Sequence, residues 1–353
     1  ALARTPAAAE PATLTGVMTP GSPLQANTRK PRWLAPRRQG LPTLEKYVHL
    51  SHRGRRTPAA AVEASRGCRH VCRHCPLTPI YRGRFMAVPL DTVLQDVAAV
   101  AHSGAGHITF ADPDFLNGPT HALRVAREMH RRFPGLTFDF TAKVEHLVAH
   151  AGLLPDLAEQ GGLFVVSAVE SLSDTVLAHL DKGHTRADVA LALAAVRRAG
   201  MILRPTLLPF TPWATTGDLG DLLAWIADED LAGAVDPVQM SIRLLVPPGS
   251  PLAASAAMRP FLTGLAAADF AWGWRHPDPH MDLLQERISA RVVAGMDEEP
   301  ELVHRDIARL AAPVQGLPAT AFPGNPEPAV STASPPPPRH RDGWPRLTEP
   351  WFC

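Results

Sequence analysis

Three of the four cysteines in this chain lie within eight residues of one another. Cys68, Cys72 and Cys75 are spaced as C-x3-C-x2-C, and the fourth, Cys353, is the last residue of the sequence. Thiolates bind iron and zinc well, so this spacing indicates a metal centre rather than scattered core residues. A [4Fe–4S] cluster normally takes four thiolates. Three thiolates without a nearby fourth would leave one iron open to bind another molecule.

Three interpretations of these cysteines compete. A structural zinc site could use them together with His70 or His74, although no second pair of ligands follows, as it does in the commonest zinc layout. A c-type haem attachment is excluded, because Pro76 stands where the required histidine would follow the last cysteine. The cysteines could also be inert. The spacing favours an iron–sulfur cluster.

Charge is distributed unevenly along a chain that has a net charge of +1. Residues 1–66 hold eleven Lys and Arg but three acidic residues, and such a basic arm can bind nucleic acid. A zinc-stabilised nucleic-acid-binding protein is therefore the alternative to an enzyme. Aromatic residues are not interleaved with these charges, so we expect no nucleic-acid partner. No apolar run reaches the roughly 18 residues of a membrane span, and clustered cysteines are no disulfide framework. We expect a cytoplasmic protein without a membrane partner.

Short apolar segments alternate with amphipathic helical patterns from about residue 59. We expect strands at 60–65, 107–111, 136–141, 163–168, 202–208 and 238–242. We expect helices at 90–102, 120–133, 153–159, 188–199 and 218–230. This alternation is typical of an α/β fold with right-handed βαβ units, which would curl the sheet into an open or closed barrel. Active residues of such barrels lie at the carboxyl ends of the strands, and the cysteines directly follow the first strand.

Composition divides the chain into four regions. Residues 1–45 are basic and rich in Ala and Pro, and we expect them to be disordered. Residues 46–255 contain the barrel, and residues 256–315 a helical C-terminal extension. Residues 316–353 form a Pro-rich linker and a tail that ends in cysteine.

The cysteine spacing and its place after the first strand resemble the radical S-adenosylmethionine (SAM) superfamily, whose core is a partial (β/α)6 TIM-like barrel. Within it, residues 66–285 and the chain's ending are similar to the CUAEP/CCAEP-tail radical SAM (seleno)proteins. The stretches that carry this likeness are 66–76, 110–117, 141–147, 204–213, 244–250 and 347–353. In that family the tail continues with a second cysteine or selenocysteine and then Ala-Glu-Pro. We therefore expect truncation at a selenocysteine codon directly after Cys353.

The resemblance implies a reaction and its cofactors. Cys68, Cys72 and Cys75 would bind a [4Fe–4S] cluster whose fourth iron binds the amino and carboxylate groups of SAM. A low-potential donor such as flavodoxin or ferredoxin would supply the electron that cleaves SAM to methionine and a 5′-deoxyadenosyl radical. That radical would abstract hydrogen from an unidentified small-molecule substrate. If the tail is truncated, the alternative to an active enzyme is an inactive fragment of a radical SAM selenoprotein.

The resemblance also suggests residues around SAM. Asp112 and Asp114 stand at the second strand end, where the superfamily often has Gly-Gly-Glu, and would accept hydrogen bonds from the SAM ammonium. His74 precedes the third cysteine, at a position that is often aromatic. Ser167 and Glu170 lie near the end of the fourth strand, where polar groups bind the ribose hydroxyls.

Two cations and the terminal thiol complete the candidate site. Lys143 and Arg204 are candidate partners for the SAM carboxylate or for an anionic substrate. We prefer Arg204, because a guanidinium binds a carboxylate with two hydrogen bonds. Cys353 is a candidate redox residue that would act with a neighbouring thiol or selenol.

Overall fold

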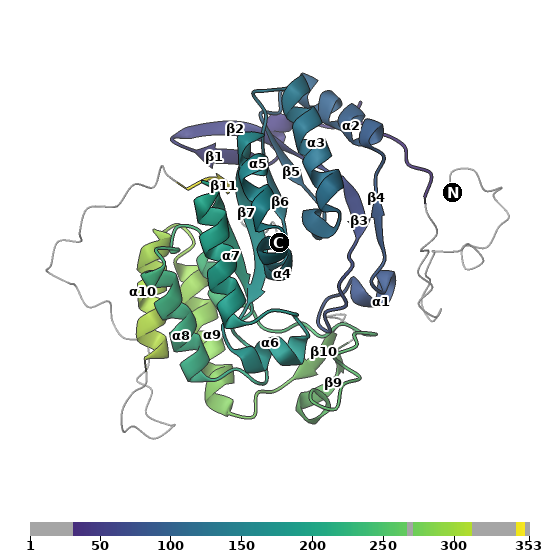
Figure 1. Ribbon diagram of the computed structural model, residues 1–353. Coiled ribbons are helices and arrows are strands. Elements are labelled where there is room, and N and C mark those ends of the chain that lie inside the picture. Colours follow the sequence, from purple (N-terminus) through teal and green to yellow (C-terminus); the bar gives the residue numbers. More distant parts are fainter. Residues whose placement is uncertain (1–30, 267–270, 313–343, 350–353) are drawn as a thin grey trace, which may run out of the picture.

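The computed structural model describes residues 31–266, 271–312 and 344–349, and its centre is a curled sheet of seven strands in the order β11-β1-β2-β5-β6-β7-β8 (Figure 1). Neighbouring strands from β2 to β8 are parallel, whereas β1 is antiparallel to both β2 and β11. The strands are β1 (His49–His52), β2 (Arg55–Val62), β5 (His107–Phe110), β6 (Thr137–Thr141), β7 (Gly162–Glu170), β8 (Ile202–Leu207) and β11 (Arg346–Leu347). This half-barrel confirms the predicted fold class.

Helices cover the convex face of the sheet, and α8, α9 and α10 pack beside one another (Figure 1). They are α2 (Leu90–His102), α3 (Pro119–Arg132), α4 (Val144–Ala149), α5 (Leu154–Glu159), α6 (Asp174–Leu180), α7 (Arg186–Arg198), α8 (Thr216–Asp228), α9 (Pro279–Ala294) and α10 (Pro300–Ala311). The rings of Phe110, Phe138 and Phe140 are completely buried between the layers. Within the described residues, no helix is both long and apolar enough to cross a membrane.

One predicted strand is wrong. Residues 238–242 were expected to form a sixth parallel strand, but Pro237–Ser241 form a 3-10 helix instead. Pro237 has no N–H for a strand ladder, and Asp236 caps the turn with its carboxylate. The side chain of Gln239 accepts the hydrogen bond of the Leu207 backbone N–H at 3.0 Å. The Gln239 side chain thus takes the place of a sixth strand in binding the backbone N–H at the end of β8.

A small hairpin places the cysteine loop. β3 (Ser65–Gly67) follows β2 and pairs antiparallel with β4 (Phe85–Ala87), and the cysteines lie between them, before the short helix α1 (Thr78–Tyr81). Gly67 has a φ of +82°, and a Cβ there would collide with the Arg84 carbonyl oxygen. Only glycine therefore allows this close approach of the strands.

The regions outside the barrel also have described structure. In the segment 1–45, residues 31–45 are described, and Arg38 Nε lies 2.6 Å from Asp96 Oδ1. The region 256–315 holds, besides helices α9 and α10, the hairpin of β9 (Leu262–Ala266) and β10 (Ala271–Trp274). Of the tail, residues 344–349 are described and β11 pairs with β1, whereas Cys353 lies outside the described residues.

Candidate active site

A cavity of about 1030 Å³ lies along the concave face of the sheet, between the cysteine loop and the C-terminal segment. Ligand sites usually measure roughly 300–1,000 Å³, so this one has room for a large cofactor and a substrate. The predicted site residues that line it are Cys68, Cys72, His74, Cys75, Asp112, Lys143, Glu170 and Arg204. Two other predicted residues, Asp114 and Ser167, lie outside its lining.

The cysteine loop is held by hydrogen bonds around its three free thiols. Cys72 is buried, and Cys68 and Cys75 are half-buried. Burial raises the pKa of the Cys68 and Cys75 thiols, because the thiolate is the form that loses hydration. The buried side chain of Asn117 accepts a hydrogen bond from the Arg69 N–H at 3.1 Å. The loop is therefore fixed to the turn that follows β5.

The three cysteine sulfurs are not drawn together as they would be around a single metal ion. Three thiolates on one zinc, each about 2.3 Å from the metal, would bring the sulfurs within roughly 4 Å of one another. In the part of the chain that the structure describes, His70, Asp114 and His146 form a group with all ligand atoms within 4.8 Å, and the three cysteines do not. A [4Fe–4S] cube binds each thiolate through a different iron and so needs wider spacing. The chemistry of the donors, three thiols beside a cavity, suits that cluster.

Glu170 lies at the centre of the polar network at the C-terminal edge of the sheet. Its Oε1 is 3.3 Å from Lys182 Nζ and 3.4 Å from His74 Nε2. Burial alone would raise the pKa of Glu170, but Lys182 and His74 more than offset it and lower the pKa to about 2. Glu170 also has a φ of +63°, which is unusual for a non-glycine residue. The network keeps a negative charge facing the cavity.

Asp112 is bound to the end of the first barrel strand. One carboxylate oxygen accepts a hydrogen bond from the Ala64 N–H at 2.8 Å, and the other accepts one from the Ser65 hydroxyl. Burial raises the pKa of Asp112 to about 7, although these hydrogen bonds oppose the shift. Asp112 lines the cavity, but both of its carboxylate oxygens already accept hydrogen bonds from Ala64 and Ser65.

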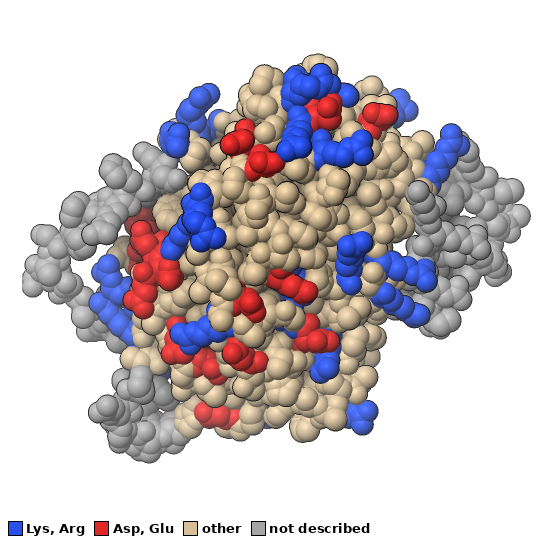
Figure 2. Space-filling view, in the orientation of Figure 1, with Lys and Arg blue, Asp and Glu red and all other residues tan. Residues whose placement is uncertain are grey.

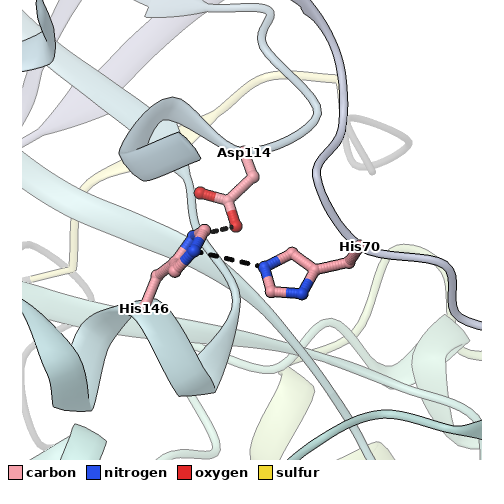
Figure 3. Close-up of side chains that lie close together, drawn as sticks. All are labelled: His70, Asp114 and His146. Atoms are coloured by element: carbon pink, nitrogen blue, oxygen red, sulfur yellow. Dashed lines mark hydrogen bonds and ion pairs between the residues drawn. The ribbon is translucent and has the colours of Figure 1, made fainter. Parts of the chain in front are cut away.

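Asp114 does not line the cavity; it contacts His146, which in turn contacts His70 (Figure 3). Its Oδ2 lies 2.7 Å from His146 Nδ1, and His146 Nε2 lies 3.2 Å from His70 Nε2 in the cysteine loop. Burial, with Lys143 and His146 nearby, lowers the pKa of His70 to about 4. Lys143 itself lies 3.3 Å from Glu145. This group joins the loops after β5 and β6 to the cysteine loop.

The remaining predicted residues are placed apart from the cysteine loop. Ser167 alternates with the cavity-lining Val166 and Ala168, so it faces the helices, where its buried Oγ has no hydrogen-bond partner among the described residues. Arg204 stacks on the Phe164 ring, with its guanidinium carbon 5.8 Å from the ring centroid. It contacts the C-terminal segment rather than the loops at the strand ends.

Sequence reasoning missed three residues of this site. Lys182 is 2% exposed and pairs with Glu170, but it follows α6 and no strand end marks it. His146 carries no spacing signal relative to the cysteines, although it falls within the stretch 141–147 that resembles a known family. Asn117 falls within the stretch 110–117 that resembles a known family, which was the one available signal for its role.

Comparison with known proteins agrees with this geometry. Residues 62–223 match the family model described as the radical SAM superfamily. A tRNA-2-methylthio-N(6)-dimethylallyladenosine synthase of Pseudomonas savastanoi pv. phaseolicola is 26% identical over 199 residues, which are 53% of this chain and 45% of that protein. The corresponding synthase of Thiobacillus denitrificans is 29% identical over 44% of this chain and 39% of its own length. The chain thus spans less than half of these relatives.

Solved structures show the same fold. The cobalamin-dependent SAM radical enzyme OxsB with aqua-cobalamin bound has a TM-score of 0.56 and 16% identity, over 70% of this chain and 46% of that one. Over residues 62–223 this chain resembles the radical SAM superfamily, and the proteins that it matches there are enzymes. The cofactors of that superfamily are a [4Fe–4S] cluster and SAM, and the three thiols beside the cavity fit the cluster.

Proposed function

We propose that this chain is a radical SAM enzyme that generates a 5′-deoxyadenosyl radical and abstracts hydrogen from a small-molecule substrate. One observation carries the proposal. Cys68, Cys72 and Cys75 open onto the same cavity as polar residues from the ends of three barrel strands, and this cavity is larger than most single-ligand sites. The cofactor and the substrate can therefore lie side by side, which radical transfer requires.

The residues of the chain have distinct proposed tasks. When bound, the cluster and SAM supply one-electron reductive cleavage of a carbon–sulfur bond, with the electron coming from a donor such as flavodoxin or ferredoxin. Cys68, Cys72 and Cys75 would hold three irons. The ionised Glu170 is oriented by Lys182 and can accept hydrogen bonds from ribose hydroxyls. The sheet and the loops around the cavity limit the access of water to the radical.

The direct test is anaerobic reconstitution followed by reaction with SAM and dithionite. We expect about four irons per chain, a brown protein, and 5′-deoxyadenosine in the products. A colourless protein with about one zinc per chain and no 5′-deoxyadenosine would overturn the proposal. The zinc-stabilised nucleic-acid-binding alternative predicts that zinc content and binding that weakens steeply with salt. On the face drawn in Figure 2, basic and acidic side chains are interspersed, which does not favour that alternative.

We further propose that the chain belongs to the CUAEP/CCAEP-tail group and acts in a reducing cytoplasm. The support is the resemblance of residues 66–285, the three free thiols, and a C-terminal segment that packs on the barrel instead of apart from it. Reading the gene past codon 353 tests the group. A codon for cysteine or selenocysteine followed by Ala-Glu-Pro is expected, and any other continuation contradicts it.

A further inference from the structure

Three arginines line the cavity near the C-terminal segment: Arg56, Arg204 and Arg346. Ser51 on β1 pairs with Arg56 on β2 and also with Arg346 on β11. Residues directly opposite one another in antiparallel strands share a face of the sheet, and neighbouring strands are about 4.8 Å apart. Arg56 and Arg346 therefore flank Ser51 on the cavity side, within reach of the same ligand.

The three guanidinium groups have few partners of their own. Among the described residues, none of them has a carboxylate oxygen within the 4.0 Å of an ion pair, unlike eleven other arginines. Arg204 donates one hydrogen bond, from Nη1 to the Pro345 carbonyl oxygen at 3.2 Å. Arg56 Nη2 lies 3.4 Å from His49 Nδ1. Because each guanidinium offers five N–H groups, most of this hydrogen-bonding capacity is open to a ligand.

Two acidic residues lie near Arg204, but their carboxylates are already engaged. Asp139 Oδ1 is 2.8 Å from His107 Nε2 and accepts a hydrogen bond from Thr109 Oγ1 at 2.7 Å. Asp236 caps the 3-10 helix that follows β8. Burial lowers the pKa of Arg204, and the nearby Arg346 lowers it further. The negative charges of Asp236 and Asp139 oppose that shift. Glu349 also lines this part of the cavity, so the three arginines are distinguished by their open N–H groups rather than by a net positive charge.

The C-terminal segment is held in place by packing and hydrogen bonds, so Arg346 is a fixed part of the cavity lining. Trp344 packs where Gly233 leaves room, since a Cβ at Gly233 would lie 2.7 Å from the indole Cδ1. The backbone of Thr348 donates to the His49 carbonyl oxygen at 2.8 Å, and its hydroxyl accepts from the His49 N–H at 3.0 Å. These contacts hold the cavity-lining residues 346–349 against the edge of β1.

We propose that Arg56, Arg204 and Arg346 form the receptor for an anionic group, a carboxylate or a phosphate, of the substrate. Guanidinium forks match both oxyanions with paired hydrogen bonds. An anion bound there would leave the rest of the substrate extending along the cavity toward the cysteine loop. The inference rests on the proposed function, because it names the class of substrate that the radical would attack.

Isothermal titration calorimetry of the reconstituted full chain at low ionic strength tests this receptor, with inorganic phosphate and glutarate as separate probes. We expect at least one probe to bind with a millimolar or lower dissociation constant, and Arg346→Ala and Arg56→Ala each to weaken it about tenfold. Phosphate binding alone assigns a phosphate, and glutarate binding alone a carboxylate. Arg198→Ala, an exposed arginine on α7 outside the cavity, is the matched control and should bind like the parent chain.

The receptor is refuted if neither probe binds, or if the parent chain and both cavity variants bind equally. Both variants replace exposed side chains, so they should fold normally. Iron content and 5′-deoxyadenosine formation are measured on the same samples. A chain that has the cluster and cleaves SAM but shows no arginine-dependent anion binding overturns this inference and leaves the proposed function standing.

Discussion

The two ends of the cavity are built differently. At the cysteine end, charged side chains form pairs, such as the half-buried Glu170 at the end of β7 with the buried Lys182 that follows α6. At the arginine end, exposed Arg56 and Arg346 lack carboxylate partners among the described residues, and they come from opposite ends of the chain. Pairing neutralises the charges at the cysteine end, whereas the open guanidinium N–H groups at the arginine end can bind a ligand. The difference indicates a permanent cofactor at one end and an exchangeable anion at the other.

The largest effect is expected from removing a ligand at the cysteine end. Cys72→Ser should abolish cluster assembly, because a serine hydroxyl does not replace a buried thiolate ligand. Iron content after anaerobic reconstitution should fall from about four per chain to near zero. Cys353→Ser is the control and should retain the iron. Full iron content in Cys72→Ser would show that this end of the cavity is not the cluster site.

The buried pair beside the cysteines should dominate stability. Glu170→Gln leaves the Lys182 ammonium buried without its counter-ion, and the free energy of unfolding should fall by about 3 kcal/mol. Asp156→Asn breaks an exposed ion pair with Arg127 and should cost less than about 1 kcal/mol. Urea unfolding measures both variants. Equal losses would mean that the two pairs do not differ in burial as described.

The raised pKa of Asp112 predicts a pH dependence with a definite sign. Between its unfolded pKa near 3.8 and its folded pKa of about 7, the folded chain binds the extra proton, so stability falls as pH rises. Asp112→Asn removes this dependence. From about pH 5 to about pH 7, the cluster-free parent chain should lose roughly 2 kcal/mol relative to the variant. A constant difference over that range would contradict the buried, proton-binding state of Asp112.

The smallest effect should come from the packing of the C-terminal segment. Gly233→Ala forces Trp344 to move, at a cost of roughly 1 kcal/mol, and should speed hydrogen exchange at the Thr348 amide. Gly220→Ala adds a methyl group to an exposed position of α8 with no atom within 4 Å. That control should stabilise the helix by up to about 1 kcal/mol without changing the exchange of Thr348. Unchanged exchange in Gly233→Ala would mean that Trp344 does not anchor this segment.

Local patterns predicted the half-barrel and singled out the cysteines that line its cavity, because this information lies within short stretches. The three cysteines lie within eight residues, so a metal centre can be predicted from one short stretch. The barrel strands can be recognised as apolar runs. The expected strand at 238–242 failed because Pro237 and Asp236 determine a turn that hydrophobicity does not reveal. Ser167 shows the same limit, since which face of β7 it occupies depends on strand register.

The arginine end could not be predicted, because it depends on pairing between distant segments. Nothing near Arg346 in the sequence indicates that β11 would pair with β1, about three hundred residues away. Arg204 was expected to bind the SAM carboxylate or an anionic substrate, and its contacts with Pro345 and Phe164, away from the cysteine loop, favour the second role. Such long-range contacts leave no periodic signal in a single sequence.

Mössbauer spectroscopy of the anaerobically reconstituted chain, with and without SAM, tests the central claim most directly. The claim is that three thiols leave one iron of a cubane free for the cofactor. We expect a [4Fe–4S] spectrum in which about one iron in four changes its environment when SAM is added. A spectrum without such a cluster, or one in which all four irons are unaffected by SAM, would contradict it.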